Sequence, residues 1–412
     1  DVMFSTCAFG EPHYHMRSSR ARMRLQDPPH AARGAQRSMR MELDSTVLYA
    51  GEVPVFYVPE FVASTGSPLG QQFALIKSID VGNSSRFGLS ARVGIGDEIY
   101  VDDARWGSWL LTPRYLSDRG LGAGFDLDYT TKDYRGEFRA AYQNDRGTDD
   151  LFGKPPGQDR GRVAWHHRHL LPEHIQLDLE GSYLSDRGFL PEYYEREFES
   201  GKEQETLVYL KRALENRALT FLARKRVNDF QDQTEYLPQL GYNLIDEPLF
   251  DIGDFTTIHF DANYEAAFVR HRFPNALDID ETETYRVDLD HTITAPIHAG
   301  PIKFAPFAGL RYTRYGDGRI IDEPIDRIGT LYGISLSTEL SRVWQVSGSP
   351  LDLFGLQHVI VPDIRYEAVD HVSHDIADFD SFDRVDAYTE EERLRFGLRQ
   401  RLQTIRNEET DP

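Results

Sequence analysis

The stretch TIHFDANYEAAF, residues 257–268, alternates apolar and polar side chains over almost its whole length. Every second residue from Ile258 to Phe268 is apolar or aromatic, whereas the positions between them from His259 to Glu265 are polar. Successive side chains of a β-strand point to opposite faces, so a period of two predicts a strand with one apolar face and one polar face.

The same alternation recurs along most of the chain. From about Gln71 onward we count roughly 14 to 16 such segments, many of them about 9–12 residues long, which is the length that crosses a bilayer when a strand is tilted. The clearest further examples are Leu121–Tyr129, Ile175–Tyr183, Tyr285–Ile293, Phe304–Tyr312, Tyr332–Leu340 and Leu394–Leu402. The pattern predicts an all-β protein built around a large antiparallel sheet.

Composition limits the classes of function. The chain has 412 residues, and 67 Asp and Glu outnumber 46 Lys and Arg, for a formal net charge of −21. A nucleic-acid-binding protein needs a basic face, so nucleic acid is not an expected partner. No run of 18 apolar residues predicts a transmembrane helix, but a transmembrane barrel alternates its faces and is polar on average.

The only cysteine is Cys7, so no disulfide forms within these 412 residues. In an oxidising compartment Cys7 is a candidate for a disulfide to a residue outside this chain, and an unpaired buried thiol is the alternative. The chain opens with DVMFSTC, without an initiating Met or a signal peptide, and is interpreted as processed or partial.

The N-terminal region differs from the rest. In VPVFYVPEFV, Val53–Val62, the prolines Pro54 and Pro59 exclude a central strand and predict an edge strand or an extended connector. The following ASTGSPLG, residues 63–70, predicts a domain boundary. We therefore expect one domain over residues 1–62 and a second over residues 63–412.

The hexapeptide YLSDRG occurs twice, at Tyr115–Gly120 and Tyr183–Gly188. No other sequence similarity recurs at this spacing, so a solenoid is not expected. Each copy places Tyr and Leu at the end of a predicted strand and continues into a polar turn. We expect Gly120 and Gly188 to adopt positive φ in these turns.

The connections between predicted strands are unequal. Some are short, such as LENRA at 214–218, whereas those at 144–160 and 375–392 are long and acidic. Short turns on one side and long polar loops on the other are typical of outer-membrane barrels. A soluble sandwich or propeller is the alternative, but the polar face of the alternating segments carries too many charges to be covered by a second sheet. The acidic loops are also candidates for divalent-cation binding.

Catalytic motifs are absent from the sequence. In WHHRHLLPEH, His167 and His169 share a strand face, but no third metal ligand follows, so polar residues at a strand end are the preferred interpretation. The acid pairs Asp126/Asp128 and Asp178/Glu180 are interpreted as carboxylates facing a watery lumen rather than as acid–base catalysts. We expect no enzyme activity, no cofactor and no metal.

Several stretches, in order along almost the whole chain, resemble the LptD family of lipopolysaccharide-assembly proteins, also called organic solvent tolerance proteins. They are FSTC, AGEVPVFYVPEF, PRYLSDRGLGAGFDLDY, LQHVIVPDIRYEAV and FGLRQRLQTIR. The resemblance implies a large antiparallel transmembrane β-barrel, here partial, preceded by the end of a periplasmic β-taco (jelly-roll) domain. One departure is that QQFALIKSIDVGNSSRFGLSARVGIG, residues 71–96, lacks the prolines that the family carries in its first barrel strands.

The resemblance also implies a function. The protein would be an outer-membrane translocon, with its N-terminal part in the periplasm, that inserts lipopolysaccharide into the outer leaflet through a polar lumen and a lateral seam. Its partners would be lipopolysaccharide, outer-membrane lipid, a plug lipoprotein of the LptE type and a periplasmic bridge protein of the LptA type. On this model the lipid path includes Val55, Phe56, Tyr57, Val58 and Phe61. Packing at a domain junction is the alternative role for these five residues.

Two rival functions belong to other classes. A general outer-membrane porin or substrate channel would have a similar barrel but would not need the VPVFYVPEF segment. A barrel enzyme, such as an outer-membrane protease or lipase, would need acids and a histidine in a defined geometry that the sequence does not reveal.

Overall fold

The computed structural model describes residues 2–4, 14–26, 38–50, 53–65, 76–101, 104–317, 323–347 and 354–405. The chain divides into two compact units. The first, called unit 1 below, comprises residues 1–166 and 182–204, and unit 2 comprises residues 167–181 and 205–412. The helices in the described part are short, and none is long and apolar enough to span a bilayer.

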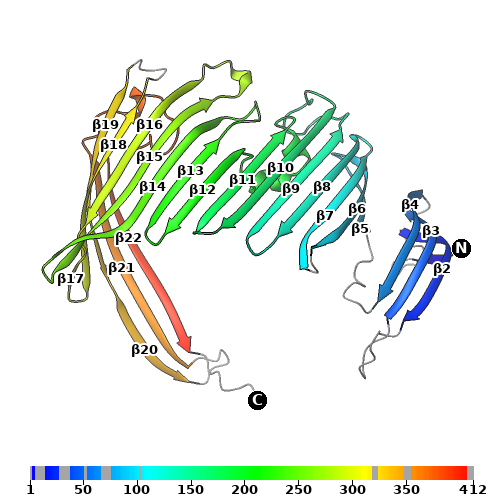
Figure 1. Cartoon of the computed structure of the whole chain (residues 1–412), viewed down its shortest axis with the longest axis horizontal. Coiled ribbons are helices and arrows are strands. Elements are labelled where there is room, and N and C mark those ends of the chain that lie inside the picture. The colour runs from blue at the N-terminus through cyan, green and yellow to red at the C-terminus, as the bar shows by residue number, and fades with distance from the viewer. Residues whose placement is uncertain are drawn as a thin grey trace. The chain divides into compact units, whose positions relative to one another are not determined.

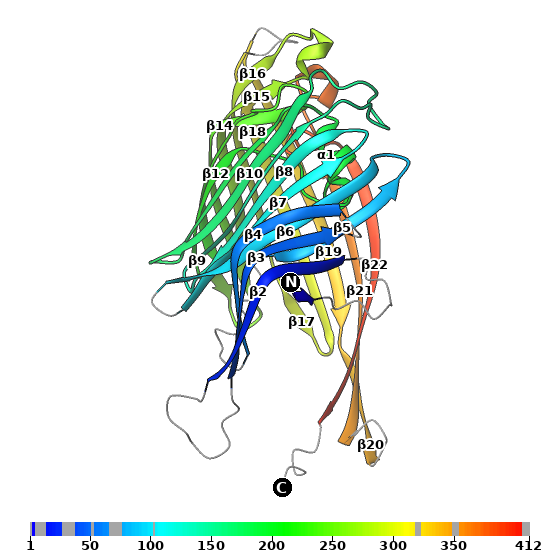
Figure 2. The same cartoon turned by 90° about the vertical axis from the view of Figure 1, so that its right-hand side faces the viewer.

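A four-stranded antiparallel sheet is formed by β1 (Val2–Phe4), β2 (Tyr14–Gln26), β3 (Ser38–Ala50) and β4 (Val53–Thr65) in chain order (Figure 2). Among the described strands, β4 pairs only with β3, and the register shifts beside Pro54. Proline has no N–H to donate, so it is tolerated at an edge. The prediction of an edge strand over Val53–Val62 is confirmed.

The remaining strands form a second, much larger antiparallel sheet, which confirms the predicted fold class (Figure 1). They are β5 (Ile76–Ser84), β6 (Gly88–Val101), β7 (Ala104–Leu116), β8 (Gly120–Thr130), β9 (Tyr134–Asn144), β10 (Asp159–Leu171), β11 (Ile175–Leu184), β12 (Leu207–Leu214), β13 (Arg217–Arg224), β14 (Gln233–Ile252), β15 (Thr256–Arg272), β16 (Thr282–Thr294), β17 (Ile297–Ala299), β18 (Ile302–Tyr315), β19 (Ile325–Thr338), β20 (Leu340–Ser347), β21 (Phe354–Asp370) and β22 (Glu391–Ile405). Two helices, α1 (Phe189–Tyr193) and α2 (Glu195–Ser200), lie between β11 and β12.

Four of these strands are the halves of two longer strands, each of which is interrupted once. β16 and β17 both pair with β18, and β19 and β20 both pair with β21. The first interruption contains Pro296, which removes a backbone donor. Counting each interrupted strand once leaves sixteen strands in this sheet among the described residues, within the range of roughly 14 to 16 alternating segments in the sequence.

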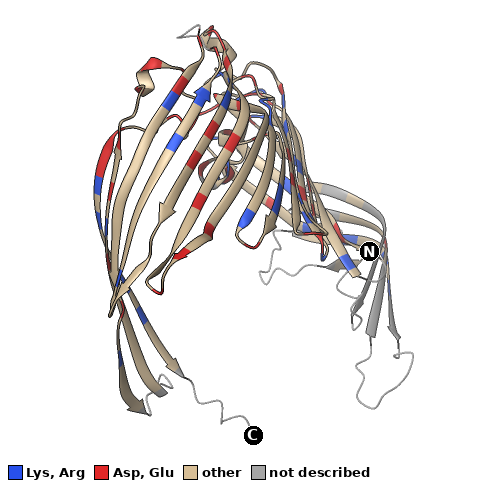
Figure 3. Ribbon diagram, turned by 60° about the vertical axis from the view of Figure 1, so that its left-hand side comes forward, with Lys and Arg blue, Asp and Glu red and all other residues tan. Residues whose placement is uncertain are grey.

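The register in unit 2 separates a polar face from an apolar face. On one face Asn243 pairs with Asn263, and Asn263 in turn pairs with Asp290. Charged residues recur along the strands of the large sheet (Figure 3). On the other face Tyr242 pairs with Tyr264, and apolar side chains such as Leu240, 53% exposed, are not covered. Soluble proteins rarely expose so extended an apolar surface. A transmembrane barrel wall exposes one to lipid.

Aromatic residues mark both ends of the strands in unit 1. Tyr115, Tyr142 and Tyr183 are exposed at the end that carries the long loops. Tyr115 pairs with Leu121 at the start of β8. Tyr129 lies eight residues farther along the same strand, which is roughly 26 Å away. There Trp165 donates a hydrogen bond to the Tyr129 hydroxyl at 3.0 Å. Two aromatic belts at this separation are typical of a barrel that crosses a membrane.

Candidate functional site

The long acidic loops fold back onto the strands and are held by buried arginines. In unit 1 we call the residues Arg86, Arg119, Asp145, Asp149, Arg160, Asp186 and Glu192 the first ion cluster. Arg160, at the start of β10, is its centre, with a side chain that is 1% exposed. Its guanidinium donates to Asp145 at 2.7 Å, to Asp149 at 2.6 Å and to Asp186 at 2.7 Å. One strand-end arginine thus ties together two connecting segments.

Arg119, in the turn between β7 and β8, contributes the second buried guanidinium. It donates to Asp145, to the Thr148 carbonyl at 2.6 Å and to Glu192 of α1. Arg86 holds the same Glu192 from the turn between β5 and β6, at 3.0 Å. The carboxylate of Glu192 therefore anchors α1 to two strand turns.

The first ion cluster remains charged although it is buried. Burial raises the pKa of Asp145, but hydrogen bonds from Tyr193, the Gly147 N–H and Arg160 outweigh burial and bring this pKa below its usual range. Burial and the hydrogen bond to Asp145 raise the pKa of Tyr193, so the phenol remains protonated. A buried ion pair is tolerated only when hydrogen bonds satisfy its remaining atoms, and here the carboxylate is met by several donors.

Both copies of YLSDRG lie in this region and form the same local hydrogen bonds. Ser117 and Ser185 each accept a backbone N–H through the side-chain oxygen, from Leu89 at 2.9 Å and from Gly161 at 3.0 Å. Each serine N–H donates in return to the carbonyl of that same residue. The serine is therefore the shared structural element of the repeat.

The two copies differ beyond the serine. The first copy buries its arginine, Arg119, and the second buries its aspartate, Asp186. Gly120 has the expected positive φ of 109°, but the prediction for Gly188 is wrong, since its φ is −86° and it caps the start of α1. Glycine is needed at 188 for space, because a Cβ there would overlap the Asp149 carboxylate.

In unit 2 the loop between β21 and β22, residues 371–390, is held by a second ion cluster of Glu265, Arg286, Arg327, Asp383 and Asp386. Arg286 on β16 donates to Asp383 at 2.7 Å and to Asp386 at 2.9 Å. Arg327 on β19 donates to the carbonyls of His374 and Asp386, both at 3.0 Å. The loop supplies Asp383 and Asp386, and the strands supply both arginines and Glu265.

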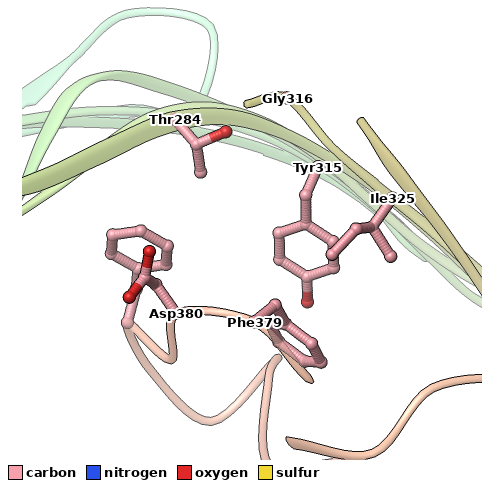
Figure 4. A pocket seen from close by; sticks show the side chains of 7 residues that line it. Thr284, Tyr315, Gly316, Ile325, Phe379 and Asp380 are labelled. Atoms are coloured by element: carbon pink, nitrogen blue, oxygen red, sulfur yellow. The ribbon is translucent and has the colours of Figure 1, made fainter. Parts of the chain in front are cut away.

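Apolar contacts complete the attachment of the 371–390 loop. Phe382 packs with Tyr236, Ala267 and Val269, and Phe379 packs with Tyr315 and Ile325. Figure 4 shows Phe379 beneath Tyr315 and Ile325. The cavity that these residues line has a volume of about 10 Å³, enough for little more than one water molecule. Asp383 and Asp386 of the loop bind Arg286, which also donates to Glu265 on the polar face of β15, so the loop lies over this end of the polar face.

The structure does not test the predicted lipid-path residues. Val55, Phe56, Tyr57, Val58 and Phe61 belong to β4, but of these side chains only Tyr57 is described, exposed with its hydroxyl 3.4 Å from Ser45 Oγ. Cys7 lies outside the described residues. The proposed lipid path and the disulfide remain predictions.

The other residues singled out by sequence have ordinary partners. His166 lies 2.9 Å from Glu137, and the rings of His167 and His169 contact each other with centroids 5.8 Å apart. No group of three His, Cys, Asp or Glu side chains is placed to hold a metal within the described ranges. Arg139 contacts Asp126 and Asp128, and Arg168 contacts Asp178.

Sequence reasoning missed the two ion clusters. Asp145, Asp149, Asp383 and Asp386 of the acidic loops are held by arginines. Divalent-cation binding by these loops remains a hypothesis. The available indication was the excess of acids in the loops together with arginines at the strand ends, but nothing in the sequence pairs a particular arginine with a particular acid.

Comparison with known proteins identifies the family to which the chain belongs. The model of the LptD family, described as LPS transport system D, matches residues 158–407, more than half of the chain. The chain belongs to the LptD family. The match runs from the start of β10 to the end of β22, so it contains the second ion cluster and the 371–390 loop.

Individual relatives in the LptD family are distant. The LPS-assembly protein LptD of Azoarcus sp. is 24% identical over 337 residues, which are 79% of this chain and 36% of the relative. The LPS-assembly protein LptD of Pseudomonas entomophila is 28% identical over 32% of this chain and 15% of the relative. The LPS-assembly protein LptD of Xanthomonas axonopodis pv. citri is 30% identical over 37% of this chain and 17% of the relative. The chain thus spans well under half the length of these curated relatives.

Proposed function

We propose that the protein is the membrane part of an outer-membrane translocon that inserts lipopolysaccharide into the outer leaflet. Membership of the LptD family supports lipopolysaccharide as the substrate. The sheet, with one polar and one apolar face, supports a route along which the two parts of the lipid meet different surfaces. Lipopolysaccharide has apolar acyl chains and a polar, sugar-rich head. An apolar face matches the environment of the acyl chains, and a polar face lining a lumen matches that of the head.

The single observation that carries the proposal is the covered polar face in unit 2. A diffusion porin needs an unobstructed polar channel, whereas here the 371–390 loop is fastened onto the polar face by buried ion pairs and two phenylalanines. A translocon that delivers lipid sideways through a seam has no use for a permanently open outer end. We therefore favour the translocon over the porin.

The β1–β4 sheet would lie in the periplasm and deliver the acyl chains along β4. On this proposal Val55, Phe56, Tyr57, Val58 and Phe61 contact the lipid, and Cys7 forms a disulfide with a residue outside this chain. A plug lipoprotein of the LptE type and a bridge protein of the LptA type would be the protein partners.

The test is photo-crosslinking in cells that express the full-length protein. A photoreactive residue replaces Phe56, and the matched control carries it at Lys154, an exposed residue of the long loop between β9 and β10. We expect lipopolysaccharide adducts at Phe56 and none at Lys154 while the lipid is being exported. Absence of the Phe56 adduct, together with free permeation of small solutes through the purified protein, would replace the translocon by a porin.

A further inference from the structure

A pocket of about 350 Å³ lies on the polar face of β12 to β16, within unit 2. Its polar lining residues include Lys211, Thr220, Asn243, Asp261, Asn263 and Asp290. It lies near the short turn that joins β12 to β13. Asn243 is seven residues along β14 from Tyr236, roughly 23 Å of strand, so the pocket is well separated from the 371–390 loop.

The register brings these side chains together as neighbours. Lys211 faces Thr220 across β12 and β13, and Asn243 faces Asn263 across β14 and β15. Asn263 in turn faces Asp290 on β16. Adjacent strands are about 4.8 Å apart, so donors and acceptors follow one another across the wall at nearly regular intervals.

Much of the hydrogen-bonding capacity of this row is unused. Asn243 Nδ2 donates to Asn263 Oδ1, which leaves the Asn243 side-chain oxygen and the Asn263 side-chain nitrogen, in two residues that line the pocket, without a side-chain partner in the described part of the chain. Within the described residues, neither the Lys211 side chain nor the Thr220 side chain has a hydrogen bond or ion pair. Polar groups without protein partners in a pocket are available to a ligand.

The chemistry of the row favours a neutral polyol. One lysine stands among two carboxylates, so the pocket lacks the positive excess that a phosphate group requires. Each sugar hydroxyl both donates and accepts, and it matches a row in which amide, hydroxyl, ammonium and carboxylate groups alternate. Tyr209 and Ile245 add apolar surface against which the C–H face of a sugar ring packs.

We propose that this pocket is a docking site for the sugar rings of a glycan, which rests on the proposed function and specifies where the saccharide head of the transported lipid binds the wall. Asn243 and Asn263 form the centre of the site, and Lys211 and Thr220 contact the next ring of the chain.

The probe is the lipid-free core oligosaccharide released from lipopolysaccharide by mild acid. Its binding to the full-length protein in detergent is measured by saturation-transfer NMR and calorimetry. We expect the Asn243→Ala/Asn263→Ala double variant to lose at least tenfold in affinity, and the single Lys211→Ala variant to lose less. The matched control is Leu219→Ala, next to Thr220 but on the apolar face, which is expected to bind like the wild type.

Unchanged binding in both pocket variants, or an equal loss in Leu219→Ala, would overturn the proposal. The Lys211→Ala variant keeps the test valid if the double variant does not fold, since this exposed side chain has no hydrogen bond or ion pair to lose among the described residues. Competition separates the sources of binding, because lipid A without core sugars must not displace the oligosaccharide. If the wild type binds no oligosaccharide while Phe56 still crosslinks to lipopolysaccharide, the sugar site is wrong and the translocon stands.

Discussion

Arg286 and Asp386 form a hydrogen-bonded ion pair at 2.9 Å although 100 residues separate them, and both side chains are fully buried. The arginine belongs to a strand and the aspartate to the loop between two later strands. An ion pair enclosed in this way keeps the loop on the polar face, because opening it would expose the loop's apolar residues and break its paired charges.

Removing the charge of Asp386 from its pair with Arg286 is therefore expected to destabilise the 371–390 loop strongly. Asp386→Asn removes one of the three carboxylates that bond the buried Arg286, while Asp383 and Glu265 remain. We therefore expect a loss of about 3 kcal/mol, the lower end of the cost of breaking a buried ion pair. Urea unfolding in detergent micelles, with hydrogen exchange of residues 371–390, measures the effect. The control is Asp326→Asn, whose exposed pair with Arg314 is worth about 1 kcal/mol or less. Equal losses in the two variants would contradict a special role for the buried pair.

Gly188→Ala is expected to loosen the first ion cluster. The new methyl group would overlap the Asp149 carboxylate, which Arg160 holds in place, so α1 or the loop after β9 must shift. Limited proteolysis of residues 145–158 reports that shift as faster cleavage. Gly181→Ala, where the added methyl meets no atom within 4 Å, is the matched control. Resistance to cleavage equal to the wild type in the Gly188 variant would show that the cluster tolerates the methyl.

The 371–390 loop is expected to stay attached in mild acid and to open only in strong acid. Burial opposes ionisation of Asp383, but hydrogen bonds from Arg286 and Tyr236 lower its pKa below the ordinary value of 3.8. A lowered folded-state pKa contributes stability above pH 3.8, which is lost as the pH falls through the folded-state pKa.

Pepsin, which is active in acid, provides the measurement for this pH dependence. Cleavage near Phe379 and Phe382 is expected at pH 2 but not at pH 5. In Asp383→Asn, which lacks the titrating group, cleavage should occur at both values. Wild-type cleavage at pH 5 would exclude the proposed dependence.

Neighbouring residues on opposite faces of β14 are expected to respond differently to a charge. Leu240 is exposed on the apolar face, whereas Gln239 faces the polar side and bonds Glu265 at 2.5 Å. Leu240→Arg places a cation in lipid and should cost about 2–4 kcal/mol, while Gln239→Arg can pair with Glu265 and should cost little. The free energy of unfolding from lipid vesicles is measured for both variants and for the wild type. A larger cost for Gln239→Arg would invert the assignment of the lipid-facing side.

Local patterns in the sequence were sufficient for the strands and their faces. The alternation in residues 257–268 predicted β15, and the prolines of Val53–Val62 predicted an edge strand. Such patterns are readable because the β-strand period is short, and because the two faces of the sheet differ in polarity from one residue to the next.

The contacts of the loops were decided only by the tertiary structure. The repeated YLSDRG turn has one local geometry at its serine, yet Arg119 is buried from one copy and Asp186 from the other. Which charge is buried depends on the strands and loops that surround each turn, not on the hexapeptide. Strand identity was thus encoded locally, whereas the ion clusters arise where strand register and loop folding bring distant charges together in a buried site.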